Sequence, residues 1–328
     1  MYTSTFQEVP TAKIVNSLQD KGFFVLENAI TEQYINELLQ EVNFDQVLVN
    51  ANDVGVVWAK HQKFLTHCLA QSKQAYDLIT SPEILEICKN YFQDRYVLIN
   101  HRIYQTHKIS HMPWHTDNNQ QVGRKLSSKH NRPGLLFLFY LSDVTTNPFQ
   151  LIKNSHLWSQ QYNNEIYISD QFVKENYQKD ILTFPLKKGS LIICNIHAVH
   201  RAEPFQDDNY TRTTLLFQVD QVGSDCMGHG EKNLVNTEFL DNLTPEIMNY
   251  LGFGYKTDYP AFPNTSVATL TTQDIITLQR QLLPSTLKAM GKNLALNVLP
   301  GEVLIQLKRW LWNFNKQQTN RVKVKESE

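Results

Sequence analysis

Five short runs rich in Val, Ile, Leu, Phe and Tyr follow one another between residues 96 and 220 of this 328-residue chain. β-Branched and aromatic residues favour an extended backbone, and turn signals containing Pro, Gly and Asn separate the runs. A succession of short strands predicts a core built as a β-sandwich or a β-barrel. The runs are YVLINHRIYQTH, GLLFLFYLSDV, ILTFPL, SLIICNIHAVH and RTTLLFQVD.

Helical patterns lie on both sides of this strand-rich region. Thr31 and Ser81 each precede a segment with apolar residues at helical spacing, and both are favourable N-cap residues. Two more helices are predicted near the C-terminus, within TTQDIITLQRQLL and GEVLIQLKRWLWNFN. We therefore predict a mainly β fold with helical flanks and a first domain over 1–222. It would comprise a helical part, 1–94, and a β core, 95–222, with a mostly helical extension, 223–328, packed on that core.

Charge and cysteine content argue against several classes of function. The chain has 31 basic and 32 acidic residues, so it lacks the basic excess that nucleic-acid binding requires. No uninterrupted apolar run approaches the roughly 18 residues of a membrane span, and the first residues lack a secretory pattern. The four cysteines form no CxxC pair, which favours reduced thiols and a cytoplasmic protein. Monomer and homodimer both stay open.

A histidine and an aspartate two residues apart stand in the stretch HMPWHTDNNQ, residues 111–120. At the end of a strand, His115 and Asp117 point to the same face, so both can reach one metal ion. Pro113 argues against a helix here, and the glutamate that a zinc-peptidase helix needs is missing. A metal site would therefore need a third ligand from a distant part of the chain.

His197 and His200 are the candidates for that third ligand. Residues three apart on a strand face opposite sides, so only one of the two can join the first pair. Arg212 opens the following run, which we expect to form a hairpin with SLIICNIHAVH, and its shorter spacing from His200 favours that residue. Two histidines and one carboxylate form the facial ligand set of non-haem Fe(II) oxygenases, which leaves positions open for cosubstrate and oxygen.

Five segments also carry a family resemblance. They are GFFVLENAITEQYINELLQEV, PWHTDNN, LFLFYLSDVTTNPFQLIKNSH, LKKGSLIICNIHAVHRAEPF and RTTLLFQV, and the resemblance covers roughly residues 15 to 222. In this order they resemble the phytanoyl-CoA dioxygenase family of Fe(II)- and 2-oxoglutarate-dependent oxygenases. The resemblance implies a double-stranded β-helix, a jelly-roll core of the cupin type. It also implies Fe(II), 2-oxoglutarate and O2 as cofactor, cosubstrate and oxidant.

The resemblance implies an iron site and a cosubstrate site. The residues implied to bind iron, and so to be catalytic, are His115, Asp117 and His200. Arg212 is implied to grip the far carboxylate of 2-oxoglutarate, and we expect Tyr104 and Thr214 to contact the same molecule. Trp114, Tyr104 and Trp158 are candidates for the walls of the pocket.

The implied reaction is hydroxylation of a substrate C–H bond, coupled to conversion of 2-oxoglutarate and O2 into succinate and CO2. Asp117 favours hydroxylation over halogenation, because halogenating relatives have a small residue at that position. Desaturation, cyclisation and epimerisation stay open, as does a non-catalytic metal-binding or sensing module of the same fold. The expected partner is a small-molecule or carrier-linked substrate, and the basic residues of loop 118–132 could receive an anionic one.

Overall fold

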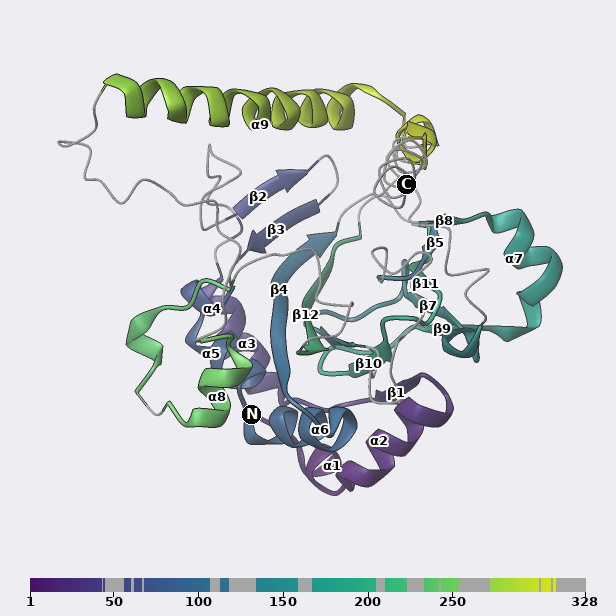
Figure 1. Ribbon diagram of the computed structural model, residues 1–328. Helices are drawn as coiled ribbons and strands as arrows, with labels where there is room; N and C mark the ends of the chain where they lie inside the picture. Colours follow the sequence, from purple (N-terminus) through teal and green to yellow (C-terminus); the bar gives the residue numbers. More distant parts are fainter. Residues whose placement is uncertain are drawn as a thin grey trace, which may run out of the picture. The chain divides into compact units, whose positions relative to one another are not determined.

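The computed structural model divides the chain into two compact units, Met1–Phe253 and Gly254–Glu328 (Figure 1). All strands among the described residues belong to the first unit. The structure describes residues 1–42, 44, 56–59, 62–66, 68–106, 113–117, 134–158, 167–204, 210–222, 233–241, 243–253, 272–300, 302–307 and 309–310.

Two antiparallel sheets form the centre of the first unit, and they confirm the predicted mainly β fold with helical flanks. The larger sheet has the strand order β1 (Phe23–Leu26), β10 (Leu191–Asn195), β6 (Leu135–Tyr140), β12 (Arg212–Gln221), β4 (Tyr96–Thr106), β3 (Gln62–Thr66) and β2 (Val56–Ala59). The smaller sheet has the order β8 (Tyr167–Ile168), β5 (Trp114–His115), β11 (His200–Ala202), β7 (Phe149–Ile152) and β9 (Ile181–Phe184).

The prediction that SLIICNIHAVH and RTTLLFQV form a hairpin is wrong. The first of these runs divides into two strands in different sheets, β10 and β11, with a turn between them. β12 instead pairs with β4 on one side and with β6 on the other. The turn carries the chain from one sheet to the other, so His200 and Arg212 stand on separate sheets rather than on neighbouring strands.

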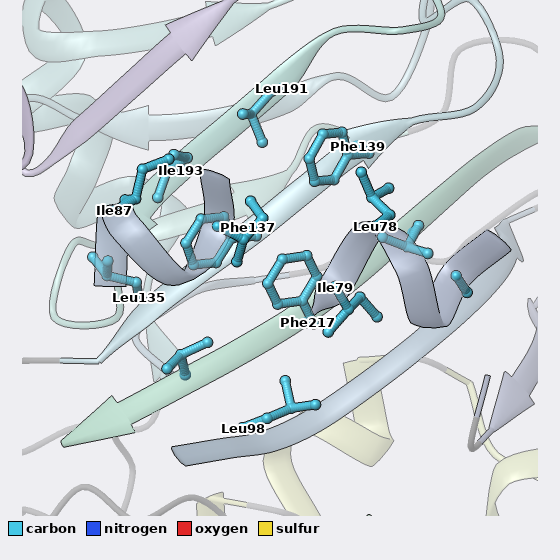
Figure 2. Packing of buried hydrophobic residues seen from close by; sticks show 14 of the residues in the cluster. Leu78, Ile79, Ile87, Leu98, Leu135, Phe137, Phe139, Leu191, Ile193 and Phe217 are labelled. Carbon is cyan, nitrogen blue, oxygen red and sulfur yellow. The ribbon is translucent and has the colours of Figure 1, made fainter. Parts of the chain in front are cut away.

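The central strands of the larger sheet are buried on both faces, which explains their continuous apolar sequence. Alternate residues of β6 point to opposite sides because the strand period is two. Phe137 and Phe139 face the N-terminal helices, whereas Leu136 and Leu138 face the smaller sheet. Figure 2 shows the helix side, where Phe217 of β12 lies against Phe137 with ring centres 4.6 Å apart.

Helices cover the outer face of the larger sheet. They are α1 (Ser4–Gln7), α2 (Thr11–Asp20), α3 (Glu32–Glu41), α4 (Cys68–Gln71), α5 (Lys73–Ile79) and α6 (Pro82–Phe92), and they contribute to one apolar cluster with the sheet. The two predicted caps are confirmed: Thr31 Oγ1 accepts a hydrogen bond from Tyr34 N at 3.2 Å, and Ser81 Oγ accepts one from Ile84 N at 3.4 Å. α7 (Asp170–Tyr177) lies in the connection between β8 and β9.

Residues 233–241 and 243–253 belong to the first unit. α8 (Pro245–Tyr250) lies here, and the side chain of Tyr250 is fully buried against Tyr96, with ring centres 5.9 Å apart. The compact unit therefore continues to Phe253. The division of the chain into domains 1–222 and 223–328 stays a prediction.

The second unit contains the helix predicted within TTQDIITLQRQLL, which is confirmed as part of α9 (Thr272–Val298). The helix predicted within GEVLIQLKRWLWNFN is helical at 302–307 and 309–310, and its remaining residues lie outside the described ones. None of the helices in the described part of the chain combines the length and apolar character that a membrane crossing needs.

Candidate metal centre and cosubstrate pocket

The two histidines of the candidate metal centre lie directly opposite each other. His115 of β5 and His200 of β11 are the one residue pair in register between these antiparallel strands. Asp117 follows β5 on the same face, and its backbone N–H donates to the carbonyl oxygen of Ile196 at 3.2 Å. The start of β11 and the end of β5 thus bring His200 to a pair of residues that is far from it in sequence.

The three side chains present their ligand atoms to a common point. His115 Nε2 lies 3.8 Å from Asp117 Oδ1, and His200 Nε2 lies 3.5 Å from Asp117 Oδ2. One possible ligand atom from each of the three residues lies within 4.8 Å of the other two. Among the described residues, His115, Asp117 and His200 form the group with this geometry.

Backbone carbonyl groups fix the orientation of both imidazoles. His115 Nδ1 lies 2.8 Å from the oxygen of Pro113, and His200 Nδ1 lies 3.0 Å from the oxygen of Ala198. A carbonyl oxygen can only accept, so each Nδ1 carries a proton, and each Nε2 is the nitrogen that can bind a metal. Two imidazoles that offer Nε2 and a carboxylate in this arrangement fit a divalent transition metal.

His197 does not belong to this group. It is buried, and its backbone N–H donates to Asn195 Oδ1 at 2.8 Å. Burial lowers the pKa of its imidazole, and the charge of His156 lowers it further, to about 4. The geometry thus brings His200, the histidine that the spacing favoured, to the other two residues.

A cavity of about 210 Å³ adjoins the three residues. Its lining combines charged groups with an apolar wall from both sheets. The lining residues are Arg102, Tyr104, His115, Asp117, Leu136, Leu138, Tyr140, Phe149, His200, Arg201, Ala202, Arg212 and Leu216.

Arg212 and Tyr104, both predicted to contact the cosubstrate, line this cavity. The Arg212 side chain is 5% exposed, and its Nη1 donates to the carbonyl oxygen of Asn147. Its guanidinium carbon lies 6.0 Å from the centre of the Tyr104 ring. A buried guanidinium of this kind is suited to a carboxylate, because a charge-assisted pair is strong where water is excluded.

Thr214 lies beside this pair but not on the described wall of the cavity. It is in register with Tyr104 on one side and with Tyr140 on the other, and it is fully buried. Its hydroxyl oxygen has no hydrogen-bond partner among the described residues. A contact between Thr214 and the cosubstrate stays a prediction.

The aromatic residues predicted as pocket walls have different positions. Tyr104 lines the cavity, whereas Trp114 is buried in a separate cluster with Ile168 and Val199. Trp158 packs against Tyr177, with ring centres 4.3 Å apart. The described wall of the metal cavity includes neither tryptophan. His111 and the loop 118–132 lie outside the described residues.

Three polar residues of the cavity lining were missed in the sequence. Arg102 stands two residues before Tyr104 in β4, and that spacing could have placed it on the same face. Tyr140 alternates with Leu138 in the same way, and burial raises the pKa of its hydroxyl to about 12, so the hydroxyl keeps its proton. Arg201 follows a metal-ligand candidate directly and carried no pattern of its own.

Comparisons with known proteins agree with this architecture. The fold is similar to HygX from Streptomyces hygroscopicus, solved with nickel and 2-oxoglutarate bound, at 13% identity and a TM-score of 0.50 over 66% of this chain and 89% of that chain. It is also similar to the epimerase SnoN, solved in complex with Fe3+, alpha ketoglutarate and nogalamycin RO. That match has 15% identity and a TM-score of 0.50, and covers 78% of this chain and 96% of that chain. At this identity the two structures support the jelly-roll fold alone.

The sequence matches none of the curated proteins with which it was compared. It does match the family described as phytanoyl-CoA dioxygenase (PhyH) over residues 18–213, which is more than half of the chain. The chain therefore belongs to the phytanoyl-CoA dioxygenase family, whose members use Fe(II), 2-oxoglutarate and O2.

Proposed function

We propose that this protein hydroxylates a C–H bond of a small-molecule or carrier-linked metabolite. In the balanced reaction, one oxygen atom of O2 enters the substrate, and the other enters succinate as 2-oxoglutarate loses CO2. The observation that carries the proposal is the group of His115, Asp117 and His200 beside a cavity that also contains Arg212.

The chain's own residues would bind and orient the reactants. His115, Asp117 and His200 would hold Fe(II), which together with 2-oxoglutarate supplies the activation of O2. Arg212 would hold the carboxylate of 2-oxoglutarate that does not reach the iron. Its burial strengthens this pairing, because few water molecules compete for the guanidinium.

The apolar part of the wall has a separate task. Leu136, Leu138 and Leu216 come from neighbouring strands of the larger sheet and line one side of the cavity. They would exclude water around the reacting C–H bond and so limit unproductive turnover. The volume of about 210 Å³ suits a small reacting moiety, whether it belongs to a free metabolite or to the end of a longer carrier-linked chain.

An anaerobic titration tests the cofactor assignment. Fe(II) and 2-oxoglutarate added together should produce the weak visible charge-transfer band of a chelated complex. The variant Arg212→Met should need more 2-oxoglutarate to reach the same band, whereas Arg95→Met, at an exposed position outside the cavity, should titrate like the wild type. A folded wild-type protein that gives no band at millimolar cosubstrate would refute the assignment.

Product analysis tests the outcome of the reaction. Hydroxylation adds one oxygen atom to the substrate, and this atom should carry the label when the reaction runs under 18O2. Desaturation or cyclisation would instead remove two hydrogen atoms, and epimerisation would leave the mass unchanged. An unlabelled product with either of these signatures would replace hydroxylation while keeping the metal centre.

A further inference from the structure

Two residues that flank the histidines contact each other. Trp114 directly precedes His115, and Arg201 directly follows His200. Because side chains alternate along a strand, Trp114 and Arg201 extend from the face opposite that of the two histidines, although Arg201 also contributes to the lining of the cavity. The Arg201 guanidinium carbon lies 4.3 Å from the centre of the Trp114 ring, a cation–π contact between β5 and β11.

Arg201 also contacts two further elements. Its Nε donates to Gln150 Oε1 of β7 at 2.8 Å, and its Nη1 lies 2.5 Å from Asp170 Oδ1 at the start of α7. The planar guanidinium can make these three contacts at once, which the single nitrogen of a lysine cannot do. Arg201 therefore connects β11 to β5, β7 and α7.

The indole in this contact is itself held in place. The Trp114 side chain is 1% exposed and belongs to a cluster of four other buried residues, Ile152, Ile168, Val173 and Val199. These residues come from β7, β8, α7 and the turn before β11. The guanidinium thus packs on a fixed surface rather than on a side chain that moves with it.

The backbone pairing between β5 and β11, the two strands that carry the histidines, is short. β5 has two residues and β11 has three, and the pair is in register at His115 and His200 alone. So short a ladder restrains the strands weakly, whereas a metal site needs its ligands held within about 0.5 Å of their working geometry. The contact of Arg201 with Trp114 supplies a restraint at the same point of the strand pair.

We propose that Arg201 is a positioning residue that holds His115 and His200 at the separation that metal binding requires. This inference rests on the proposed metal centre and adds to it a residue that positions two of its ligands. Arg201 would act through the backbone of the two strands rather than by touching the ion. Residues that hydrogen-bond directly to metal ligands typically change metal affinity by about 10- to 100-fold when they are replaced, and we expect an effect of the same order for Arg201.

Co(II) binding tests this role without turnover, because the absorption bands of bound Co(II) report on ligand geometry. Arg201→Met, which keeps the apolar part of the side chain, should raise the Kd for Co(II) by about 10- to 100-fold and alter the bands. Arg201→Lys, which keeps the charge, should recover part of the affinity. Arg95→Met, at an exposed arginine, should bind Co(II) like the wild type.

Three results would overturn the inference. The first is that Arg201→Met binds Co(II) with a Kd within about threefold of the wild type and with the same absorption bands, a smaller change than a ligand-orienting role would cause. If Arg201→Met does not fold, Arg201→Lys decides the matter, and wild-type affinity in that variant would count against the role. If the wild type itself binds no Co(II), the metal centre fails and the inference fails with it. That result is distinct from the first two.

Discussion

His115 and His200 face each other across neighbouring antiparallel strands, with ring centres 4.5 Å apart. Each ring is oriented by a backbone carbonyl group so that its Nε2 is directed towards the carboxylate of Asp117. The carboxylate is the one anionic member of this group, and it balances part of the charge of a divalent ion.

Replacing this carboxylate should remove the metal. We expect Asp117→Ala to lower Co(II) or Fe(II) affinity by about 100-fold or more, since even residues that only orient ligands cost 10- to 100-fold. Succinate production should fall to background. Isothermal titration with Co(II) measures the first effect, and Asp20→Ala, which removes an exposed carboxylate elsewhere, is the matched control. Unchanged affinity in Asp117→Ala would exclude this residue as a ligand.

Local features of the fold could be predicted from the sequence because they depend on neighbouring residues. Thr31 and Ser81 each cap the helix that begins at the next residue, through a hydrogen bond to a backbone N–H three residues on. His115 and Asp117 share a face because side chains alternate along a strand. The strand-rich runs were visible because β-branched and aromatic residues are concentrated in them. Each of these features depends on residues that are close together in the sequence.

The sheet pairing could not be predicted in the same way. The turn between β10 and β11 looked like a continuation of one strand, because Ile196 and Val199 are as apolar as the strand residues around them. Spacing along each strand could indicate the face of Arg102 and Tyr140, but their position beside the residues of β12 depends on the register of β12 with β4 and β6. Register between strands far apart in sequence is set by tertiary packing, which cannot be read from the sequence of one chain.

Arg212 should determine the affinity for 2-oxoglutarate. A hydrogen bond to a charged group contributes about 1.5–3 kcal/mol, so we expect Arg212→Met to raise the KM for 2-oxoglutarate roughly 10- to 150-fold. The same variant should discriminate less against 2-oxopentanoate, which lacks the distal carboxylate. Steady-state succinate or CO2 assays with both oxo acids measure the change. A KM for 2-oxoglutarate that does not move would assign its carboxylate to another group.

The buried His197 should make the fold sensitive to acid. Its folded pKa of about 4 lies below the ordinary value of 6.5, so between these values the unfolded chain binds a proton that the folded chain does not. This contribution to stability is fully present above pH 6.5 and decreases as the pH falls towards 4, by up to about 1.4 kcal/mol per pH unit. Urea unfolding of wild type and His197→Gln over this range measures it. The variant should show the shallower dependence, and equal slopes would contradict the prediction.

Phe217 should contribute strongly to stability from the helix side of the larger sheet. It lies 4.6 Å from Phe137 and 6.3 Å from Phe139 between ring centres, and it is fully buried (Figure 2). Phe217→Ala should therefore cost about 3–5 kcal/mol in the free energy of unfolding, because it leaves a cavity in a close-packed core. Met248→Ala, at a 41% exposed side chain, should cost about 0.5 kcal/mol or less. Comparable losses from both substitutions in urea unfolding would contradict this assignment of the core.

Arg102 should affect the binding of the substrate rather than the binding of 2-oxoglutarate. It is in register with Leu216, four residues along β12 from Arg212, a separation of roughly 13 Å along the strand. That is longer than the five-carbon chain of 2-oxoglutarate, so we expect Arg102, which also lines the cavity, to serve the part of it beyond the cosubstrate. Arg102→Gln should leave the KM for 2-oxoglutarate within about threefold and raise that of a negatively charged substrate roughly tenfold or more. Succinate assays with a charged substrate and its neutral ester measure both values. An equal rise for 2-oxoglutarate would instead place Arg102 at the cosubstrate.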